Sequence, residues 1–213
     1  QNPLNGSNNF AIDGTKSQSG NVIVANEPDL QLTLPSIWYA SHLTAPDMNV
    51  MGVTVPGTPV MLIGFNDSIA WGVTNSPRDQ VDWYSVTYRD ENRKEYLYDN
   101  KWFKTEKKLE QFNIKDAAPF IDTIIHVHHG PVVYDRNFYG DNEKKNFAMR
   151  WIAHDQATTF HAMYAINKAK NYDAFTNALR RFSGPPQNII YGSVAGDIAI
   201  NLPGKFPVKW KEQ

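Results

Sequence analysis

Short apolar and β-branched runs, separated by polar turns, recur along most of the chain. In the first half they span 10–12, 21–25, 48–55, 60–65, 69–74 and 83–88. In the second half they span 121–128, 132–134, 147–152, 189–191 and 197–202. Turn residues lie between them, as at 56–59 and 66–67, and runs of this length bounded by turns are typical of strands. We therefore expect most of the sequence to form β-strands.

Two helices are expected late in the chain. Thr158 or Thr159 can cap the first, which would run through about Lys170. An apolar stripe with spacings of three, four and three begins at Tyr172, and Asn171 is placed to cap the helix that carries it. The order of many strands, two helices and then two more strands argues for an α+β fold with an antiparallel sheet.

Composition narrows the possible partners and sites. The 213 residues are enough to bury a core, and a formal net charge of −1 gives no sign of a nucleic-acid or membrane partner. The charged segment 90–116 mixes both signs, so we expect solvated hairpins there. The absence of cysteine excludes disulfides and cysteine catalysis. No apolar run approaches the roughly 18 residues of a membrane-spanning helix.

Ser7 is a candidate nucleophile, since it follows a glycine and precedes two asparagines. A serine hydroxyl needs a base, and its own α-amine can serve once the chain is cut between Gly6 and Ser7. The same residues are also typical of a plain turn. The strands expected at 10–12 and 21–25 would hold Ser7 on a sheet rather than on a free tail.

Three other groups have both a chemical and a plain structural interpretation. Asp79 and Asp82, with backbone carbonyls between them, offer oxygen ligands for calcium or form a polar turn. His126 and His128 share one face of an expected strand but lack an obvious third zinc ligand. The side chain of Asn188 can donate to a developing oxyanion or bond its own backbone in a turn.

Several stretches carry motifs in one fixed order along the chain. They include Gly-Ser-Asn-Asn-Phe at 6–10, Ala-Asn-Glu-Pro at 25–28, Ile-Ala-Trp-Gly-Val-Thr-Asn at 69–75 and Pro-Gln-Asn at 186–188. The others lie at 35–39, 52, 56–59, 64–66, 79–82, 129–132, 150–151 and 202–207. Together they resemble the penicillin acylase family of N-terminal nucleophile hydrolases, and they cover nearly the whole chain.

The resemblance implies a precursor made of a signal peptide, an α-chain, a spacer and a β-chain, which cuts itself before the β-chain serine. That serine would be Ser7. Residues 1–6 would be a spacer remnant, and 7–213 the first part of the β-chain, forming a single incomplete domain. The implied fold is part of an αββα sandwich. The implied compartment is the periplasm or outside the cell, and the implied partners are the missing α-chain and the rest of the β-chain.

The chemistry implied by the resemblance is hydrolysis of a linear amide. The α-amine of Ser7 would act as the base, its hydroxyl would attack the carbonyl, and water would release the acid from the acyl-enzyme. The family's oxyanion donors fall on the main chain of Asn75 and the side chain of Asn188. Lys209 stands where the family usually has arginine, which keeps the charge and loses the bidentate fork.

The resemblance also implies a possible calcium segment, and one more position differs from the family pattern. Asp79, the carbonyl of Val81, and Asp82 match a structural calcium segment known in parts of the family. Catalysis would need no cofactor. Asp29 stands where the family often has a histidine, which points to an altered amine pKa or a divergent substrate class.

We therefore expect a piece of an amidohydrolase that acts on an acylated β-lactam of the penicillin or cephalosporin type, on an acyl-homoserine lactone or on another amide. The piece alone is expected to be inactive, since the serine amine is blocked and chains are missing. Two alternatives stay open. One is a β-rich carbohydrate-binding module that uses Trp38, Tyr39 and Trp83. The other is a degenerate, non-catalytic family member that never cuts itself.

Overall fold

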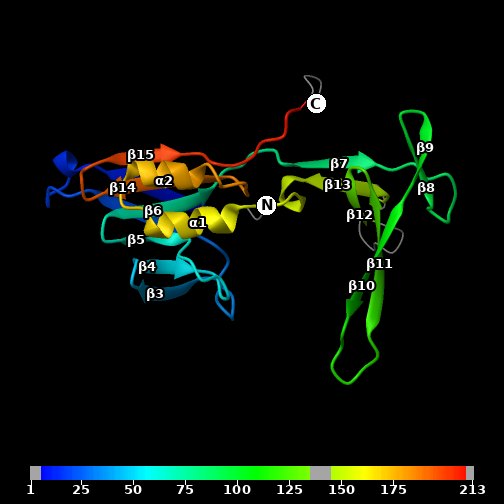
Figure 1. Ribbon diagram of the computed structural model, residues 1–213, viewed down its shortest axis with the longest axis horizontal. Coiled ribbons are helices and arrows are strands. Elements are labelled where there is room, and N and C mark those ends of the chain that lie inside the picture. The colour runs from blue at the N-terminus through cyan, green and yellow to red at the C-terminus, as the bar shows by residue number, and fades with distance from the viewer. Residues whose placement is uncertain (1–5, 135–144, 210–213) are drawn as a thin grey trace. The chain divides into compact units, whose positions relative to one another are not determined.

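The structure, a computed structural model, describes residues 6–134 and 145–209 (Figure 1). The chain forms two compact units, the first made of 1–78 with 156–213 and the second of 79–155. Residues 1–5 of the expected spacer remnant lie outside the described residues, and the single domain over 7–213 stays a prediction. Among the described residues, no helix combines the length and apolar character needed to cross a membrane.

The first unit is an α+β structure whose strand pairs are all antiparallel, as the sequence predicts. Its central sheet has the order β15-β14-β6-β5-β4-β3, and β1 and β2 form a separate hairpin. Its elements are β1 (Ser7–Ile12), the 3-10 turn η1 (Gly14–Lys16), β2 (Ile23–Pro28), β3 (Tyr39–Ala45), β4 (Met48–Thr54), β5 (Ile63–Asn66), β6 (Ile69–Asn75), α1 (Thr159–Lys168), α2 (Tyr172–Leu179), β14 (Gln187–Ser193) and β15 (Ile198–Asn201).

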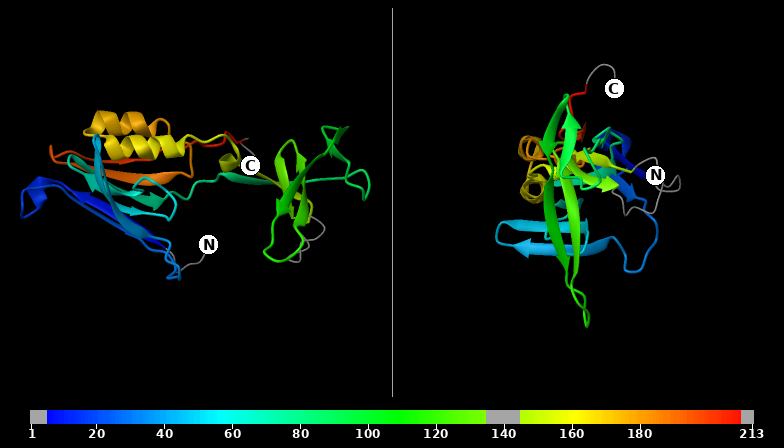
Figure 2. Two further views of the ribbon diagram at one scale, coloured as in Figure 1. Left: turned by 60° about the horizontal axis from the view of Figure 1, so that its bottom comes forward. Right: turned by 90° about the vertical axis from the view of Figure 1, so that its right-hand side faces the viewer.

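These elements form three layers: two helices, the central sheet, and the β1–β2 hairpin (Figure 2, left). Alternate residues of the central strands face opposite layers. Trp71 of β6 and Tyr191 of β14 are buried against Ile166 of α1 and Phe175 of α2. The helices therefore cover one face of the central sheet and leave its other face for the hairpin.

Two glycines of the central sheet allow the hairpin to approach closely. A Cβ atom on Gly72 would lie 2.6 Å from Oδ1 of Asn26, and one on Gly192 would lie 2.5 Å from Cγ2 of Val24. Distances this short are steric clashes with β2. Glycine in a strand interior marks such close approach of another segment, so the absence of side chains at these positions brings the hairpin onto the sheet.

Replacing Gly192 with alanine is expected to destabilise the full-length protein by about 1–3 kcal/mol, because the added methyl group overpacks the layer against the stiff side chain of Val24. Denaturant unfolding measures this loss. Ala40→Ser, at an exposed position of β3, is the control and should leave stability nearly unchanged. Equal stability of the two variants would contradict the close packing of hairpin and sheet.

Both predicted helices are present, and one of their two predicted side-chain caps is observed. Asn171 caps α2, since its Oδ1 accepts a hydrogen bond from the N–H of Ala174 at 2.9 Å. The prediction of a side-chain cap on α1 is wrong. Thr158 occupies the N-cap position, but its hydroxyl donates to the carbonyl of Arg181 at 2.6 Å. The first helix is thus joined to the end of the second rather than capped locally.

The second unit is also antiparallel. Its five-stranded sheet has the order β10-β11-β12-β13-β7, with a separate β8–β9 hairpin. A small core gathers Val86, Tyr96, Val127, Val132 and Ala148. Its elements are β7 (Val81–Ser85), β8 (Glu95–Tyr98), β9 (Lys101–Lys104), β10 (Glu106–Phe112), β11 (Phe120–Val127), β12 (Gly130–Tyr134), β13 (Phe147–Trp151) and the 3-10 turn η3 (Ile152–His154).

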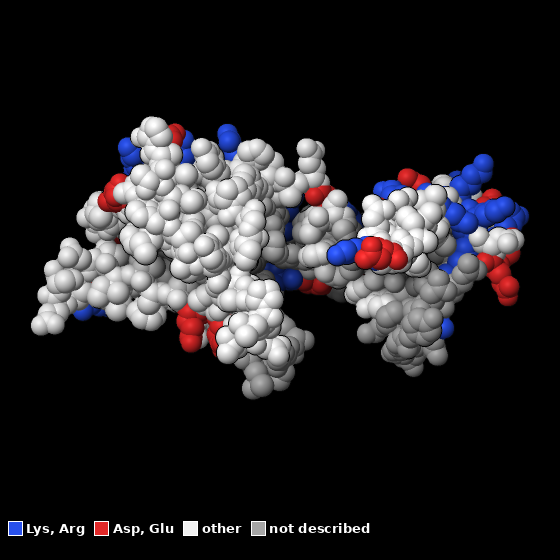
Figure 3. Space-filling view, turned by 90° about the horizontal axis from the view of Figure 1, so that it is seen from below, with Lys and Arg blue, Asp and Glu red and all other residues white. Residues whose placement is uncertain are grey.

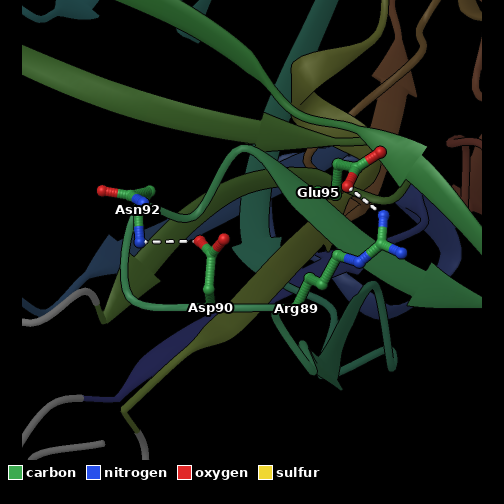
Figure 4. Close-up of polar contacts among 4 residues, drawn as sticks. All are labelled: Arg89, Asp90, Asn92 and Glu95. Carbon is green, nitrogen blue, oxygen red and sulfur yellow. Dashed lines mark hydrogen bonds and ion pairs between the residues drawn. The ribbon is translucent and has the colours of Figure 1, made fainter.

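The charged segment of this unit forms solvated hairpins, as predicted. In the turn before β8, Oδ1 of Asp90 accepts from the N–H of Asn92 at 2.9 Å, and Arg89 pairs with Glu95 at 2.7 Å (Figure 4). Exposed pairs of this kind contribute little stability. Basic and acidic side chains are interspersed over this unit on the face drawn in Figure 3. The segment therefore gives no sign of a binding patch for one charge sign.

His128 and His129 of this unit pack against tyrosines. Strand β11 ends at Val127, so His128 lies in the turn and not on one strand face with His126. The ring of His129 stacks on Tyr84 with centroids 3.6 Å apart. Burial lowers the pKa of His129 from its ordinary 6.5 to about 4, and neighbouring His128 adds to this effect.

We expect the stability of the folded protein to fall as pH falls from about 6.5 toward 4, because the unfolded chain then takes up a proton at His129 that the folded protein resists. Since the imidazole is only partly buried, solvent screening limits the effect to on the order of 1 kcal/mol. Denaturant unfolding at pH 7 and pH 4.5 tests this. His129→Gln should reduce the pH dependence, to which His126 and His128 also contribute because burial lowers their pKa values. His161→Gln, on the exposed face of α1, should leave it unchanged.

Candidate active site

Ser7 is the first residue of β1 and pairs in register with Pro28 of β2. This confirms the prediction that two strands hold it on a sheet. Along β1, Ser7 and Asn9 are half-buried, whereas Asn8 and Phe10 are exposed. Because side chains alternate along a strand, Ser7 and Asn9 share the face that is turned toward the central sheet.

Asn188 lies near the start of β14, on the face of the central sheet that the hairpin covers. Its neighbour Ile189 points the other way, into the helix-packed core. The Nδ2 amide of Asn188 donates to Oγ1 of Thr74 and to the carbonyl of Asn75, both at 3.2 Å. Asn75 is exposed at the end of β6 and pairs in register with Gln187. The two expected oxyanion donors are therefore neighbours on adjacent strands.

A hydrogen bond joins the hairpin to this end of the sheet. The Nδ2 amide of Asn9 donates to the carbonyl of Asn188 at 3.2 Å. Ser7 is two residues from Asn9 on the same face of β1, so the start of β1 lies at the end of the first unit where β6 and β14 carry Asn75 and Asn188. A hydroxyl near two N–H donors is the arrangement that attack on a carbonyl requires.

Asn26 makes a second connection between the layers. Its Oδ1 accepts from the N–H of Val73 on β6 at 2.6 Å, and its Nδ2 donates to the carbonyl of Asn8 on β1 at 3.0 Å. Sequence reasoning assigned no role to Asn9, Asn26 or Thr74. The signal available for Asn9 was its spacing of two from Ser7, which puts both on one strand face.

Two other predicted positions lie outside the strands. Lys209 is half-buried on the irregular segment that follows β15, and its supporting role stays a prediction. Asp29 is exposed and directly follows Pro28, the register partner of Ser7. An acidic side chain is thus placed one residue beyond the pair that starts the hairpin.

The expected calcium segment lies in the second unit. Asp79 is exposed, Val81 opens β7, and Asp82 is half-buried opposite Arg150 in the register of β7 and β13. Over 6–134 and 145–209, the structure gathers no three His, Cys, Asp or Glu side chains that could hold a metal. Two carboxylates and a carbonyl supply part of the six to eight oxygen ligands that calcium takes. The remaining ligands would have to be other carbonyls or water, and calcium stays a prediction.

The aromatic residues of the alternative binding module are divided between the units. Trp38 and Tyr39 belong to the first unit, and Tyr39 is exposed. Trp83 belongs to the second, where it stacks on Tyr134 with ring centroids 5.0 Å apart. The three aromatic residues therefore belong to two separate units, and the binding-module interpretation stays a prediction.

Comparison with known proteins gives concordant matches. The sequence model of the penicillin amidase family matches residues 1–213. The acyl-homoserine lactone acylase QuiP of Pseudomonas aeruginosa is 30% identical over 214 residues, covering 94% of this chain and 25% of the relative. The acyl-homoserine lactone acylase PvdQ of Pseudomonas syringae pv. syringae is 26% identical over 186 residues, covering 85% of this chain and 24% of the relative.

The fold has a solved counterpart. The structure of thermostable penicillin G acylase from Alcaligenes faecalis matches with a TM-score of 0.84 at 23% identity, covering 96% of this chain and 36% of that chain. The chain spans about a quarter of the length of the curated relatives that it matches. Because the family match extends over all 213 residues, the chain belongs to the penicillin amidase family.

Proposed function

We propose that the protein to which this chain belongs is an amidohydrolase that cleaves an N-acyl amide, with Ser7 as its nucleophile. The observation that carries the proposal is the hydrogen bond from Asn9 to the carbonyl of Asn188, at 3.2 Å, which joins the strand of Ser7 to the strand of the oxyanion donor. The family match supports the same reaction class.

The reaction begins with a cut of the precursor between Gly6 and Ser7, which frees the α-amine of Ser7. This amine takes the proton of the hydroxyl as the oxygen attacks the amide carbonyl. The tetrahedral oxyanion accepts hydrogen bonds from Nδ2 of Asn188 and from the N–H of Asn75. The leaving amine takes up the proton, and water then releases the acid from the acyl-serine by the same route.

The contacts of Asn188 support its role as a preorganised donor. Its amide already bonds Oγ1 of Thr74 and the carbonyl of Asn75, so its orientation is fixed before substrate arrives. Fixed donors stabilise a transition state without reorganising during the reaction. As the oxyanion forms it takes the place of one of these two acceptors, and the hydrogen bond that remains keeps the amide oriented.

The names of the relatives support a substrate class. QuiP and PvdQ are named for acyl-homoserine lactones, and the solved enzyme for penicillin G. Both substrates contain an acyl group on a secondary amide next to a ring, which is the unit that we propose the enzyme recognises. We further propose an exported or periplasmic enzyme assembled with an α-chain and the rest of the β-chain, in which Asp79, Val81 and Asp82 contribute to a calcium site.

The test is expression of the full-length precursor, followed by intact mass measurement and N-terminal sequencing of its large product. A β-chain that begins at Ser7 is expected, together with release of free amine from acyl-homoserine lactones or from penicillin G. A folded precursor that stays uncut and hydrolyses none of these amides would contradict the proposal and favour a degenerate, non-catalytic family member.

A further inference from the structure

We propose that Asn9 and Asn26, here called the asparagine pair, are positioning residues that set where Ser7 lies relative to its oxyanion donors. This inference rests on the proposed function and deepens it. The two residues are register partners across the β1–β2 hairpin. Each extends a side-chain amide to a different strand of the central sheet, and those two strands carry Asn75 and Asn188.

The hydrogen bonds of the pair reach backbone atoms beside both donors. Asn9 donates to the carbonyl of Asn188 itself at 3.2 Å. Asn26 accepts at 2.6 Å from the N–H of Val73, two residues before Asn75 on β6. The pair thus joins the hairpin to β14 and to β6 within two residues of the atoms that would bind the oxyanion.

Asn26 also holds the nucleophile strand. Its Nδ2 donates to the carbonyl of Asn8, the residue directly after Ser7, at 3.0 Å. A single side chain therefore connects the main chain next to the nucleophile with the main chain of β6. The missing side chain at Gly72 leaves room for this amide, since a Cβ atom there would lie 2.6 Å from Oδ1 of Asn26.

The apolar contacts between the layers fix this alignment less sharply. Val22 and Val24 pack over Gly192 through methyl groups, and such apolar contacts are non-directional. Hydrogen bonds have narrow limits of distance and angle. The asparagine pair consequently determines how far β1 is shifted along β14, and that shift sets the distance from the Ser7 hydroxyl to the amide of Asn188.

The test compares Asn26→Ala and Asn9→Ala with Asn66→Ala in the full-length protein. Asn66 is a matched control: its Nδ2 donates to the carbonyls of Asn167 and Ala169, and its Oδ1 accepts from the N–H groups of Ser68 and Ile69. It therefore bridges segments as Asn26 does, but it ties the sheet to the end of α1. Active sites are counted by titration of the Ser7 hydroxyl with a sulfonyl fluoride, so that misfolded or uncut material does not enter kcat.

Asn26→Ala is expected to slow self-cleavage and to lower kcat per active site by about 10- to 10²-fold with KM changed little, because misplacement by about 1 Å has effects of this size. Asn9→Ala removes one hydrogen bond and leaves Asn26 in place. It should fold and lower kcat in the same direction. Asn66→Ala should lower the melting temperature while kcat per active site stays at the wild-type value.

The outcomes separate the positioning role from the proposed function. Wild-type kcat per active site in Asn9→Ala and in every folded Asn26→Ala preparation would overturn the positioning role while the wild-type enzyme still hydrolyses its amide. An equal loss of kcat in Asn66→Ala would also overturn it, since the effect would then be general loosening. A wild-type protein that neither cuts itself nor hydrolyses an amide overturns both proposals.

Discussion

Replacing Ser7 with alanine is expected to leave the full-length precursor uncut and to abolish amide hydrolysis. The substitution removes the hydroxyl that attacks in both reactions, and the α-amine stays an amide because no cut frees it. A loss on the order of 10⁶-fold in kcat is typical when a serine hydrolase loses its nucleophile. Intact mass reports the cut, and release of free amine from an acyl-homoserine lactone reports the turnover.

Two companion variants make this result specific. Ser7→Cys keeps a nucleophile at the start of β1 and should retain measurable self-cleavage. Ser19→Ala removes an exposed serine from the turn between β1 and β2 and should behave as wild type. Cleavage of the Ser7→Ala variant directly after Gly6, or amide hydrolysis by this variant at the wild-type rate, would show that Ser7 is not the nucleophile.

Local patterns predicted much of the fold. The apolar stripe beginning at Tyr172 and the cap at Asn171 correspond to α2, and the paired runs at 189–191 and 197–202 correspond to the β14–β15 hairpin. The helix features depend on residues three or four positions apart, and the hairpin depends on two runs separated by a short turn. Both patterns are local and can be read from the sequence. They were sufficient for the α+β class and the antiparallel sheet.

Other elements were predicted less well, for identifiable reasons. The apolar run at 60–65 predicts a strand, but Val60 and Met61 lie in a loop, where the side chain of Asn167 bonds both the N–H and the carbonyl of Met61. Buried loop residues have the same apolar character as strand residues. Strand β3 was not predicted, because most of its side chains are exposed and lack apolar alternation. The division into two units had no local signal.

The candidate site depended on family resemblance rather than on spacing. Asn9 and Asn188 are 179 residues apart in the sequence, and their contact is made by stacking a hairpin on a sheet. No periodic pattern carries such a long-range contact. The resemblance supplied Ser7, Asn75 and Asn188, whereas the roles that we infer for Asn9 and Asn26 required the hydrogen bonds themselves.

Replacing Asn188 with alanine is expected to lower kcat by about 10²–10³-fold while KM changes little, because the lost donor stabilises the transition state more than the bound substrate. Steady-state kinetics of the full-length enzyme, per counted active site, measures the effect. Folding should survive, since Asn188 is only half-buried and its amide makes two ordinary hydrogen bonds, each contributing about 1 kcal/mol.

The charge of the replacement distinguishes an oxyanion donor from a substrate-binding contact. Asn188→Asp has nearly the same shape, but it offers only acceptors and places a negative charge where the oxyanion develops. It should therefore lose at least as much kcat as Asn188→Ala. Asn49→Ala, which removes an exposed asparagine from β4, controls for amide loss in general. Asn188→Ala could instead raise KM and leave kcat unchanged. Asn188 would then bind the substrate and the transition state equally well, and other groups would have to stabilise the oxyanion.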